Sequence, residues 1–439
     1  MSQVVVVGAG IGGLAAALSL HEVGVGVDVF EAVGEVRPLG VGINLLPHAV
    51  RELDALGLLA ELMVTAVAPR QLVYCTRRGQ EIWREDRGVA AGYPWPQISV
   101  HRGRLQQVLL DAVVDRLGAD RLHLGHRLVA VTDPSGQDGR PVAVFDRAEV
   151  EAEVGARAEG DRVEVDRAEV EADVVVAADG IHSVARARRY PDEGPPLWNG
   201  ALLWRGVAEV EPVLDGRTMV WAGHPDQKFV GYPIADLPDG RQAFNFVAEL
   251  RQPGSDLARA EDWNRRGEPG DFLPQFHDWD FDWLDVPEII RAAPETFLFP
   301  MIDRDPLPRW TFGRTTLLGD AAHPMYPIGS NGASQAILDA RVLAGCLRRH
   351  PDDVDEALAR YEAARRPATA AIVEANRGLG PELPMKLVEE RAPDGFDDIA
   401  TIISPGEIAT VTEAYRRTAG FALAALQRGS SLLDDPYEP

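Results

Sequence analysis

The feature that most constrains this chain is a glycine-rich turn near its start. The apolar run Val4–Val7 predicts a short buried strand, and the Ala- and Leu-rich stretch Leu14–Leu20 predicts a helix. Between them, Gly8, Gly10 and Gly13 complete the pattern G-x-G-x-x-G. A strand, this turn and a helix in that order are the context that a dinucleotide-binding site requires. The opening of the chain therefore predicts a Rossmann-like α/β fold.

Each glycine of this turn has a separate physical task. The first permits the tight turn, the second lets a pyrophosphate approach the backbone, and the third lets helix and strand pack closely. We expect Ile11 and Gly12, at the helix start, to offer N–H groups to the phosphates. A second predicted strand, Val25–Phe30, ends at Glu31, where an acid can bind a ribose hydroxyl and disfavours a 2′-phosphate. The site is therefore expected to hold an adenosine diphosphate group.

Composition narrows the class of protein. The 439 residues carry a formal net charge of −24, which argues against nucleic acid and anionic membrane surfaces as partners. The chain has two cysteines, Cys75 and Cys346, which cannot build a disulfide framework or a zinc pattern, so we expect no metal site. No apolar run approaches the length of a membrane span. We expect a cytoplasmic enzyme of two or three domains.

A second strand end carries an acid and a glycine. The apolar run Val174–Ala178 predicts a buried strand, and Asp179 and Gly180 follow it directly. An acid and a glycine at the carboxyl end of a strand can place a carboxylate and an open backbone in a ligand crevice.

The third signature lies about 140 residues further on. Thr315–Leu318 predicts a strand, and Gly319 and Asp320 follow it. A loop then leads into a helix predicted from about residue 333 to 347, and its turn-forming residues are Pro327, Gly329, Asn331 and Gly332. Asp320 is placed to accept hydrogen bonds from a sugar-alcohol chain. The helix start at Gly332 would aim N–H groups at an electron-rich centre, such as the N1–C2=O edge of a flavin.

These three motifs, in this order, resemble the class A flavoprotein monooxygenases, the aromatic hydroxylase family, over roughly residues 3 to 376. Within that family, several longer segments are most similar to the 5-methylphenazine-1-carboxylate monooxygenases. The resemblance implies that the first motif binds the ADP half of FAD. It also implies that Asp179-Gly180 lies near FAD and the nicotinamide cofactor, and that Asp320 binds the ribitol. Two arginines, Arg37 and Arg104, match positions that the family uses against the cofactor phosphates.

The resemblance therefore implies one set of cofactor-binding residues. They are Gly8, Gly10, Ile11, Gly12, Gly13, Glu31, Arg37, Gly42, Arg104, Asp179, Gly180, Asp320, Pro327, Gly329, Asn331 and Gly332.

The fold expected is α/β, with a Rossmann-like FAD-binding domain of the para-hydroxybenzoate-hydroxylase type. We expect this domain to be discontinuous, from residues 1–70, 98–190 and 300–380, and to carry a small antiparallel meander. The meander is predicted from a duplication, in which Asp146–Val154 recurs with one change as Asp166–Val174, because valines alternate with acids there. An inserted, mainly antiparallel β-domain of residues 71–97 and 191–299 is expected to bind substrate. A helical tail follows at 381–439, with one helix predicted over Glu407–Gln427.

The aromatic- and proline-rich stretch between about residues 190 and 300 contains no nucleotide motif, so we expect it to face the substrate. Strands are predicted over Ala201–Val210, Lys228–Ile234 and Arg241–Leu250. Alternate residues of a strand share a face, so Phe244 and Phe246 point one way and Asn245 the other. The predicted pocket-lining residues are Arg205, Tyr232, Phe244, Phe246 and Pro327. Arg205 is suited to pair with a substrate carboxylate; the alternative is that the phenylalanines are core and Arg205 joins the domains.

The residues offer no metal-ligand cluster and no Ser/His/Asp arrangement, which suits an enzyme whose cofactor carries the hard chemistry. His101, His182 and His323 are expected to be structural. The resemblance implies non-covalent FAD, reduction by NADPH or NADH that binds transiently, and a flavin C4a-hydroperoxide that hydroxylates a small aromatic or polycyclic substrate with O2. Decarboxylation can accompany this step. A monomer or homodimer is expected.

Three other functions compete with this one. The first is an FAD-dependent reductase or dehydrogenase without oxygen insertion. The second is a flavin halogenase, which the segment Tyr93–Ile98 does not support because it lacks the halogenase Trp-x-Trp-x-Ile-Pro pattern. The third is a non-catalytic FAD-binding regulator.

Overall fold

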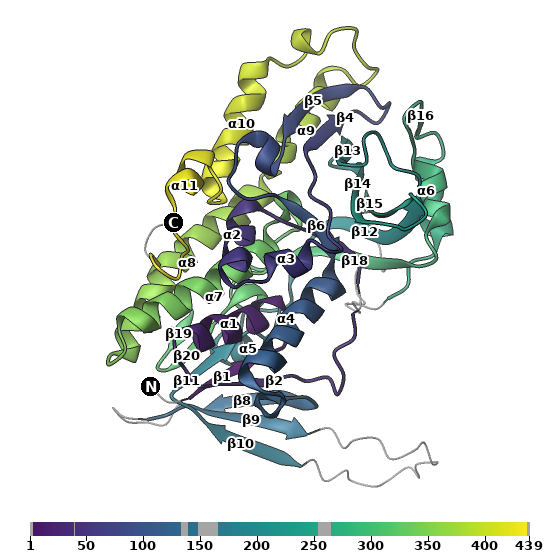
Figure 1. The fold of residues 1–439 in the computed structure, drawn as a ribbon. Helices are drawn as coiled ribbons and strands as arrows, with labels where there is room; N and C mark the ends of the chain where they lie inside the picture. Colours follow the sequence, from purple (N-terminus) through teal and green to yellow (C-terminus); the bar gives the residue numbers. More distant parts are fainter. Residues whose placement is uncertain (1–2, 39, 133–138, 148–165, 253–264, 437–439) are drawn as a thin grey trace, which may run out of the picture.

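Two large β-sheets form the framework of the computed structural model, which describes residues 3–38, 40–132, 139–147, 166–252 and 265–436. In Figure 1 the first sheet lies in the lower half of the molecule and the second at the upper right, while helices of the C-terminal part run along the left edge. The predicted α/β class, with a Rossmann-like part and an inserted β-sheet, is confirmed.

The first sheet is built around the N-terminal strand. Its order is β19 (Thr311–Phe312), β20 (Thr315–Leu317), β11 (Val174–Ala177), β1 (Val4–Val7), β2 (Val27–Phe30) and β7 (Leu122–His123). All neighbours pair in parallel except β19 with β20. Parallel strands covered on both faces are apolar throughout, and the four valines of β1 are fully or almost fully buried. The three predicted motifs therefore follow three adjacent strands, β20, β11 and β1.

Helices cover this sheet and fix the glycine turn. Helix α1 (Ile11–Glu22) packs against β1 and β2, and α4 (Arg102–Leu117) and α7 (Gly332–Arg349) pack against α1, with α8 (Val354–Arg377) against α7. Gly8 has φ of +101°, and a Cβ there would lie 2.5 Å from the carbonyl oxygen of Ala178. The crossing of β1, β11 and α1 is therefore too tight for any side chain at this position.

The duplicated acidic segment lies on a three-stranded antiparallel meander between β7 and β11. Its strands are β8 (His126–Thr132), β9 (Val142–Arg147) and β10 (Arg167–Glu171), in the order β10-β9-β8. Ion pairs across β9 and β10 join Asp146 to Arg167 and Arg147 to Asp166. The predicted meander is confirmed for these strands; the valine and acid residues predicted to alternate between 148 and 165 lie outside the described residues.

The second sheet has seven strands. Its order is β18 (Thr296–Asp303), β12 (Leu197–Val210), β15 (Gln242–Arg251), β14 (Gln227–Asp236), β13 (Thr218–His224), β4 (Gln71–Cys75) and β5 (Glu81–Asp86). Every neighbouring pair is antiparallel except β13 with β4. One face carries a core of Trp204, Phe229, Phe244 and Phe246 beneath α6 (Val286–Ala292). The other face turns toward the first sheet.

The remaining elements are short or belong to the C-terminal tail. They are β3 (Gly42–Leu45), β6 (Ile98–His101), β16 (Asp280–Phe281), β17 (Leu284–Asp285), α2 (Pro47–Ala55), α3 (Leu59–Leu62), α5 (Val184–Arg189), α9 (Leu383–Arg391), α10 (Pro405–Thr418) and α11 (Leu423–Arg428). The single helix predicted over Glu407–Gln427 is wrong. Helix α10 ends at Thr418 because Gly420, two residues on, has φ of +78°, and the chain turns before α11.

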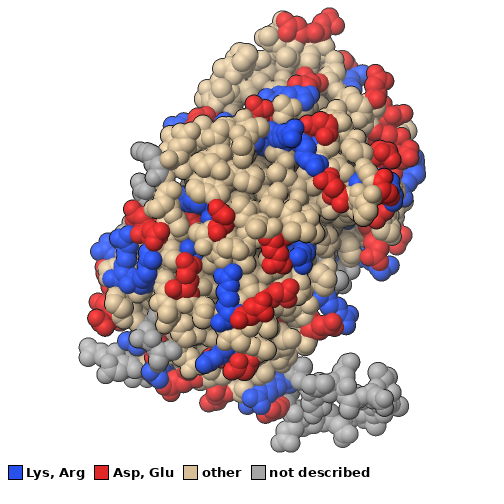
Figure 2. All heavy atoms as spheres, in the orientation of Figure 1, with Lys and Arg blue, Asp and Glu red and all other residues tan. Residues whose placement is uncertain are grey.

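The surface carries both charge signs. On the face that Figure 2 shows, basic side chains are scattered among acidic ones and form no continuous basic patch. Within the described part of the chain, no helix combines the length and apolar character needed to cross a membrane.

The glycine turn generates a paired test of stability. In Gly13→Ala the new Cβ would overlap the carbonyl oxygen of Gly8, which is backbone and cannot move cheaply. This overlap outweighs the roughly 1 kcal/mol by which Ala is the better helix former, so the free energy of unfolding should fall by about 1–3 kcal/mol. In Gly10→Ala the new Cβ meets no described atom within 4 Å. Urea unfolding of the two flavin-free proteins should therefore separate them, and equal midpoints would contradict the packing argument.

Candidate active site

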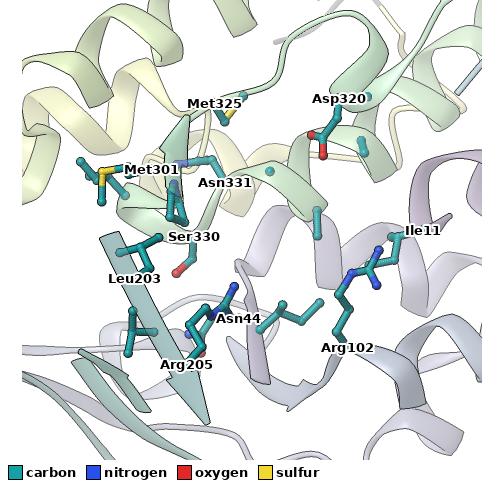
Figure 3. Close-up of a pocket in the computed structure, with 18 of the residues that line it drawn as sticks. Ile11, Asn44, Arg102, Leu203, Arg205, Met301, Asp320, Met325, Ser330 and Asn331 are labelled. Atoms are coloured by element: carbon teal, nitrogen blue, oxygen red, sulfur yellow. The ribbon is translucent and has the colours of Figure 1, made fainter. Parts of the chain in front are cut away.

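A cavity of about 360 Å³ lies between the carboxyl ends of the first sheet and the inner face of the second. At one end it is lined by the residues that follow β1, β11 and β20, among them Gly10, Gly180 and Asp320. At the other end it is lined by side chains of β12, β14 and β15. Figure 3 shows Arg102 and Asp320 on one side of this space and Leu203, Arg205 and Met301 on the other. The three predicted motifs thus meet at one site.

Two helices begin at this cavity. Gly10 is the N-cap of α1 and Asn331 is the N-cap of α7, and within the described residues neither helix start has a side-chain cap. The first N–H groups of a helix have no partner inside the helix, and they carry the positive end of its dipole. Both helix starts therefore present free donors to whatever occupies the cavity.

Asp320 and Arg102 face the same end of the cavity, where both side chains are exposed to the open space. Desolvation lowers the pKa of Arg102, an effect that the negative charge of Asp320 opposes. Desolvation likewise raises the pKa of Asp320, while His323 and Arg102 lower it. The carboxylate of Asp320, a hydrogen-bond acceptor, and the guanidinium of Arg102, a cation, therefore both line this end of the cavity.

A buried carboxylate holds the loop that carries Asp320. Asp339 on α7 is fully buried and accepts hydrogen bonds from Gly319 N at 3.1 Å, His323 Nε2 at 2.5 Å and Arg365 Nε at 2.7 Å. Burial opposes its ionisation, but His323 and Arg365 prevail and lower the pKa of Asp339 to about 2. His323 therefore braces the loop and does not face the cavity as a base.

The loop before α7 is held by the C-terminal tail. The hydroxyl of Tyr415, on α10, accepts a hydrogen bond from Asn331 Nδ2 at 2.7 Å and donates one to Asn376 Oδ1 at 2.8 Å. The ring of Tyr415 fills the space beside Gly329, whose φ is +69°. Gly329 therefore faces the tail, whereas Pro327, Asn331 and the intervening Ser330 line the cavity. The sequence motifs carried no signal for Tyr415.

The second sheet is joined to strand β3, which pairs with β6, at the peptide of Gly42. Its N–H donates to Asn245 Oδ1 at 2.7 Å, and its carbonyl oxygen accepts from Arg205 Nη2 and from Tyr232 Oη, both at 2.8 Å. A Cβ on Gly42 would lie 2.6 Å from the Cβ of Asn245. Arg205 and Tyr232 both line the cavity, as predicted, but each also holds this joint.

The prediction that Phe244 and Phe246 line the pocket is wrong. Both are fully buried in the core on the far face of the second sheet, where Phe246 stacks on Phe229. The alternation was predicted correctly, but the cavity face of β15 is the one that carries Val247 and Glu249. Periodicity separates two faces without saying which one meets the cofactor domain.

Four side chains predicted to bind cofactor have other partners and do not line this cavity, and four predicted glycines do not line it either: Gly8, Gly13, Gly42 and Gly329. Glu31 accepts from Ala9 N at 2.7 Å and braces the glycine turn. Arg37 is mostly exposed and pairs with Glu35, and Arg104 pairs with Glu61. Asp179 caps α5 through Val184 N at 2.8 Å, and burial raises its pKa.

The sequence motif His101–Leu105 contains two arginines, and the structure brings a different one to the cavity. Arg102 begins α4 and lines the cavity, whereas Arg104 lies two residues further along the same helix. Two residues along an α-helix turn the side chain by about 200°, to the opposite side. The sequence motif alone does not separate the two arginines. Their positions around the axis of α4 decide that Arg102, and not Arg104, faces the cavity.

The wall of the cavity formed mainly by the second sheet combines apolar and charged residues. Leu203, Val230, Val247 and Met301 supply the apolar part. Beside them, Lys228 Nζ contacts Glu249 Oε2 at 2.8 Å and Glu382 Oε2 at 2.5 Å, and all three side chains are buried. Burial lowers the pKa of Lys228, but the two carboxylates outweigh it and raise the pKa above its ordinary value. The sequence motifs did not indicate these charged residues.

The cofactor end of the cavity fits FAD. At Gly10, Gly180 and Gly332 a Cβ would meet no described atom within 4 Å, so the backbone there is open to close approach by a ligand. The two uncapped helix starts and Arg102 suit the negative pyrophosphate, and Asp320 suits a polyol.

Comparison with known proteins agrees with this geometry. The family model described as "FAD binding domain" matches residues 1–264 and 298–376. The chain is 44% identical over 422 residues to phenazine 1,6-dicarboxylic acid hydroxylase PhzS of Lysobacter antibioticus, an alignment that covers 94% of this chain and 96% of that protein. It is 32% identical to 3-amino-4-hydroxybenzoate 2-monooxygenase of Streptomyces cremeus, with 87% of each chain covered.

Solved structures show the same fold at lower identity. A salicylate hydroxylase substrate complex superposes with a TM-score of 0.71 at 22% identity and covers 100% of this chain and 98% of that one. Klebsiella pneumoniae HpxO complexed with FAD and uric acid superposes with a TM-score of 0.68 at 24% identity, covering 95% and 93%. The chain therefore belongs to the FAD binding domain family, and it is an FAD-dependent aromatic monooxygenase that takes its electrons from NAD(P)H.

Proposed function

We propose that this enzyme hydroxylates a planar aromatic carboxylic acid of two or three fused rings, with or without loss of the carboxyl group. The observation that carries the proposal is the single cavity that joins the FAD cradle to an apolar sheet face containing Arg205. PhzS, the relative that is 44% identical, is named for a phenazine dicarboxylic acid, and several other relatives are named for substituted benzoates. One O2, one NAD(P)H and one proton convert an aromatic C–H into C–OH, with water and NAD(P)+ as the other products.

Arg205 is the group we assign to the substrate carboxylate. Its Nη2 donates to Gly42 O, and its Nε is buried without a partner among the described residues. Its guanidinium lies 5.7 Å from the ring centre of Phe299, within the range of a cation–π contact. A guanidinium so held retains donors for a carboxylate, and hydrogen bonds of this charged type are the strong ones.

The other residues of the cavity have supporting tasks in this proposal. Bound FAD supplies electron transfer from NAD(P)H and activation of O2. The starts of α1 and α7, with Arg102, bind its phosphates and the edge of its ring system, and Asp320 binds its ribitol. Leu203, Val230 and Val247 hold the substrate ring and exclude water, which favours hydroxylation over release of peroxide. We assign the substrate to the seven-stranded sheet and the cofactor to the first sheet.

An FAD-dependent reductase that inserts no oxygen is the alternative on the same scaffold. Oxygen uptake together with mass analysis of the product separates the two, because a hydroxylase adds one oxygen atom from O2 to the ring. The same product analysis shows whether CO2 is lost. The expected monomer or homodimer and the cytoplasmic location stay predictions.

The ribitol assignment predicts that Asp320→Ala loses most of its FAD while its fold survives. The variant removes the carboxylate that lines this end of the cavity next to Arg102. Flavin absorbance of the purified protein measures occupancy, and far-UV circular dichroism measures the fold. Asp352→Ala, which removes an exposed carboxylate outside the cavity lining, is the control and should stay fully loaded. Full flavin occupancy in Asp320→Ala would contradict the assignment.

Reduction of the flavin is expected to depend on the aromatic substrate. NAD(P)H oxidation should be slow with the enzyme alone and clearly faster when a planar aromatic acid fills the apolar part of the cavity. Stopped-flow measurement of flavin bleaching, with and without each acid, tests this. Equal rates with every aromatic tested would rule out this gating.

Arg205→Gln is expected to weaken binding of an aromatic acid by about ten-fold or more, the usual worth of a charge-assisted hydrogen bond. Binding of the matching carboxamide should hardly change. Tyr232→Phe is the matched control, because it removes a hydrogen bond to the same Gly42 oxygen and leaves the cation in place. Titration of the flavin absorbance gives each dissociation constant. If both variants weaken binding of the acid and of the carboxamide equally, Arg205 only holds the peptide of Gly42 and does not bind the substrate carboxylate.

A further inference from the structure

Three charged side chains meet in the substrate-side wall of the cavity. Lys228 of β14 and Glu249 of β15 lie directly opposite each other across the two strands, and Glu382 comes from the single helical turn Gly380–Glu382 in the C-terminal part. Their exposed fractions are 2%, 5% and 4%. All three line the cavity. The charges are thus withdrawn from bulk water and can still reach a ligand in the cavity.

The cluster holds two carboxylates and one cation. Lys228 Nζ contacts Oε2 of Glu249 and Oε2 of Glu382. No hydrogen bond within the described residues reaches Oε1 of either glutamate. Because both glutamates line the cavity, these oxygens are open to a ligand there. A surplus negative charge withdrawn from bulk water is costly, and burial together with the charge of Glu249 raises the pKa of Glu382, while Lys228 opposes that shift. Anchoring the C-terminal part to the sheet would need one carboxylate for one lysine, so it does not account for the second.

We propose that Glu249 and Glu382 form a subsite that accepts a hydrogen-bond donor of the aromatic substrate: a ring hydroxyl, an amine or a ring N–H, including a cationic nitrogen. This inference rests on the proposed function, since it needs an aromatic ring in the cavity. A donor bound there satisfies the open oxygens, and a cationic nitrogen also offsets the surplus charge. The carboxylates thereby select which substituted ring is accepted and which way round it lies.

The register of the sheet places this subsite near the carboxylate subsite. Arg205 is paired with Val247, and Glu249 is the next residue of β15 on the same face. Diagonal cross-strand neighbours of this kind are about 7–8 Å apart, which is on the scale of a fused aromatic ring system. A substrate with an acid at one edge and a donor at another can therefore contact both subsites.

The subsite also gives the C-terminal part a role in specificity. Glu382 precedes α9, and α10 follows in the same part of the chain, which also supplies Tyr415 to the flavin-side loop. The C-terminal part therefore contributes an acceptor to the wall of the cavity.

Direct binding to the FAD-loaded enzyme, without NAD(P)H, tests the proposal. The probes are isomeric hydroxy- and amino-2-naphthoates, each compared with its O-methyl or N,N-dimethyl counterpart and with 2-naphthoate. In the wild type, the best donor isomer should bind about ten-fold or more tightly than its methylated counterpart. In Glu382→Gln this ratio should fall to less than three-fold, while 2-naphthoate binds as before. Glu249→Gln provides the same measurement if the first variant folds poorly.

Both variants leave Lys228 with one carboxylate, so neither strands a buried charge. Glu389→Gln is the matched control: it lies on α9, pairs with Arg77 at 3.2 Å, and does not line the cavity, so its ratio should stay at the wild-type value. A donor preference that survives in both cavity variants would overturn the proposal. So would a wild-type preference for the methylated probes. If no naphthoate binds the wild type, the proposed function fails as well; if they bind through Arg205 without donor preference, the subsite alone is refuted.

Discussion

The peptide of Gly42 is the contact on which the active-site geometry depends. Asn245, Arg205 and Tyr232, from three adjacent strands of the second sheet, all hydrogen-bond to it. Because the N–H and the carbonyl oxygen are both engaged, the sheet can neither slide nor tilt against the first domain without breaking a buried hydrogen bond. The absence of a side chain at Gly42 lets Asn245 approach. The peptide of Gly42 is therefore one of the contacts that hold the second sheet in place beside the cavity.

Buried ionic groups do two different kinds of work in this molecule. Around Asp339 every contact is complementary: one carboxylate faces His323, Arg365 and a backbone N–H, so the group is rigid and satisfied. Around Lys228 the formal charges do not balance, because two carboxylates surround one cation. Buried ion pairs contribute little net stability once their desolvation is counted. A buried cluster whose charges balance is well suited to hold a loop rigid. A cluster with one carboxylate in excess is better suited to bind a ligand that supplies a hydrogen-bond donor.

The C-terminal part is an integral part of the active site. Tyr415 holds the loop at the start of α7 from behind, and Glu382 reaches the substrate-side wall. Both contacts join positions far apart in the chain. Tyr415 packs beside Gly329, and Glu382 pairs with Lys228 on β14, and the local sequence around Gly329 or Lys228 does not predict either partner. The C-terminal part thus contacts both ends of the cavity, although it lies outside the nucleotide motifs.

The sequence by itself determined four strands of the first sheet (β1, β2, β11 and β20), three strands of the second (β12, β14 and β15) and the cofactor. Glycine spacing, apolar runs and strand-end acids are local properties, and each motif needs only its own few residues to be recognised, as at Gly8, Gly180 and Asp320. Tertiary structure decided which face of each element meets the ligand. Period-two alternation on β15 was clear, but only packing showed that Phe246 belongs to the core and Val247 to the cavity. Helix phase likewise selected Arg102 over Arg104, and long-range packing brought in Tyr415 and Glu382. A local pattern carries periodicity but not absolute orientation, because orientation is set by which buried surfaces find each other in the folded chain.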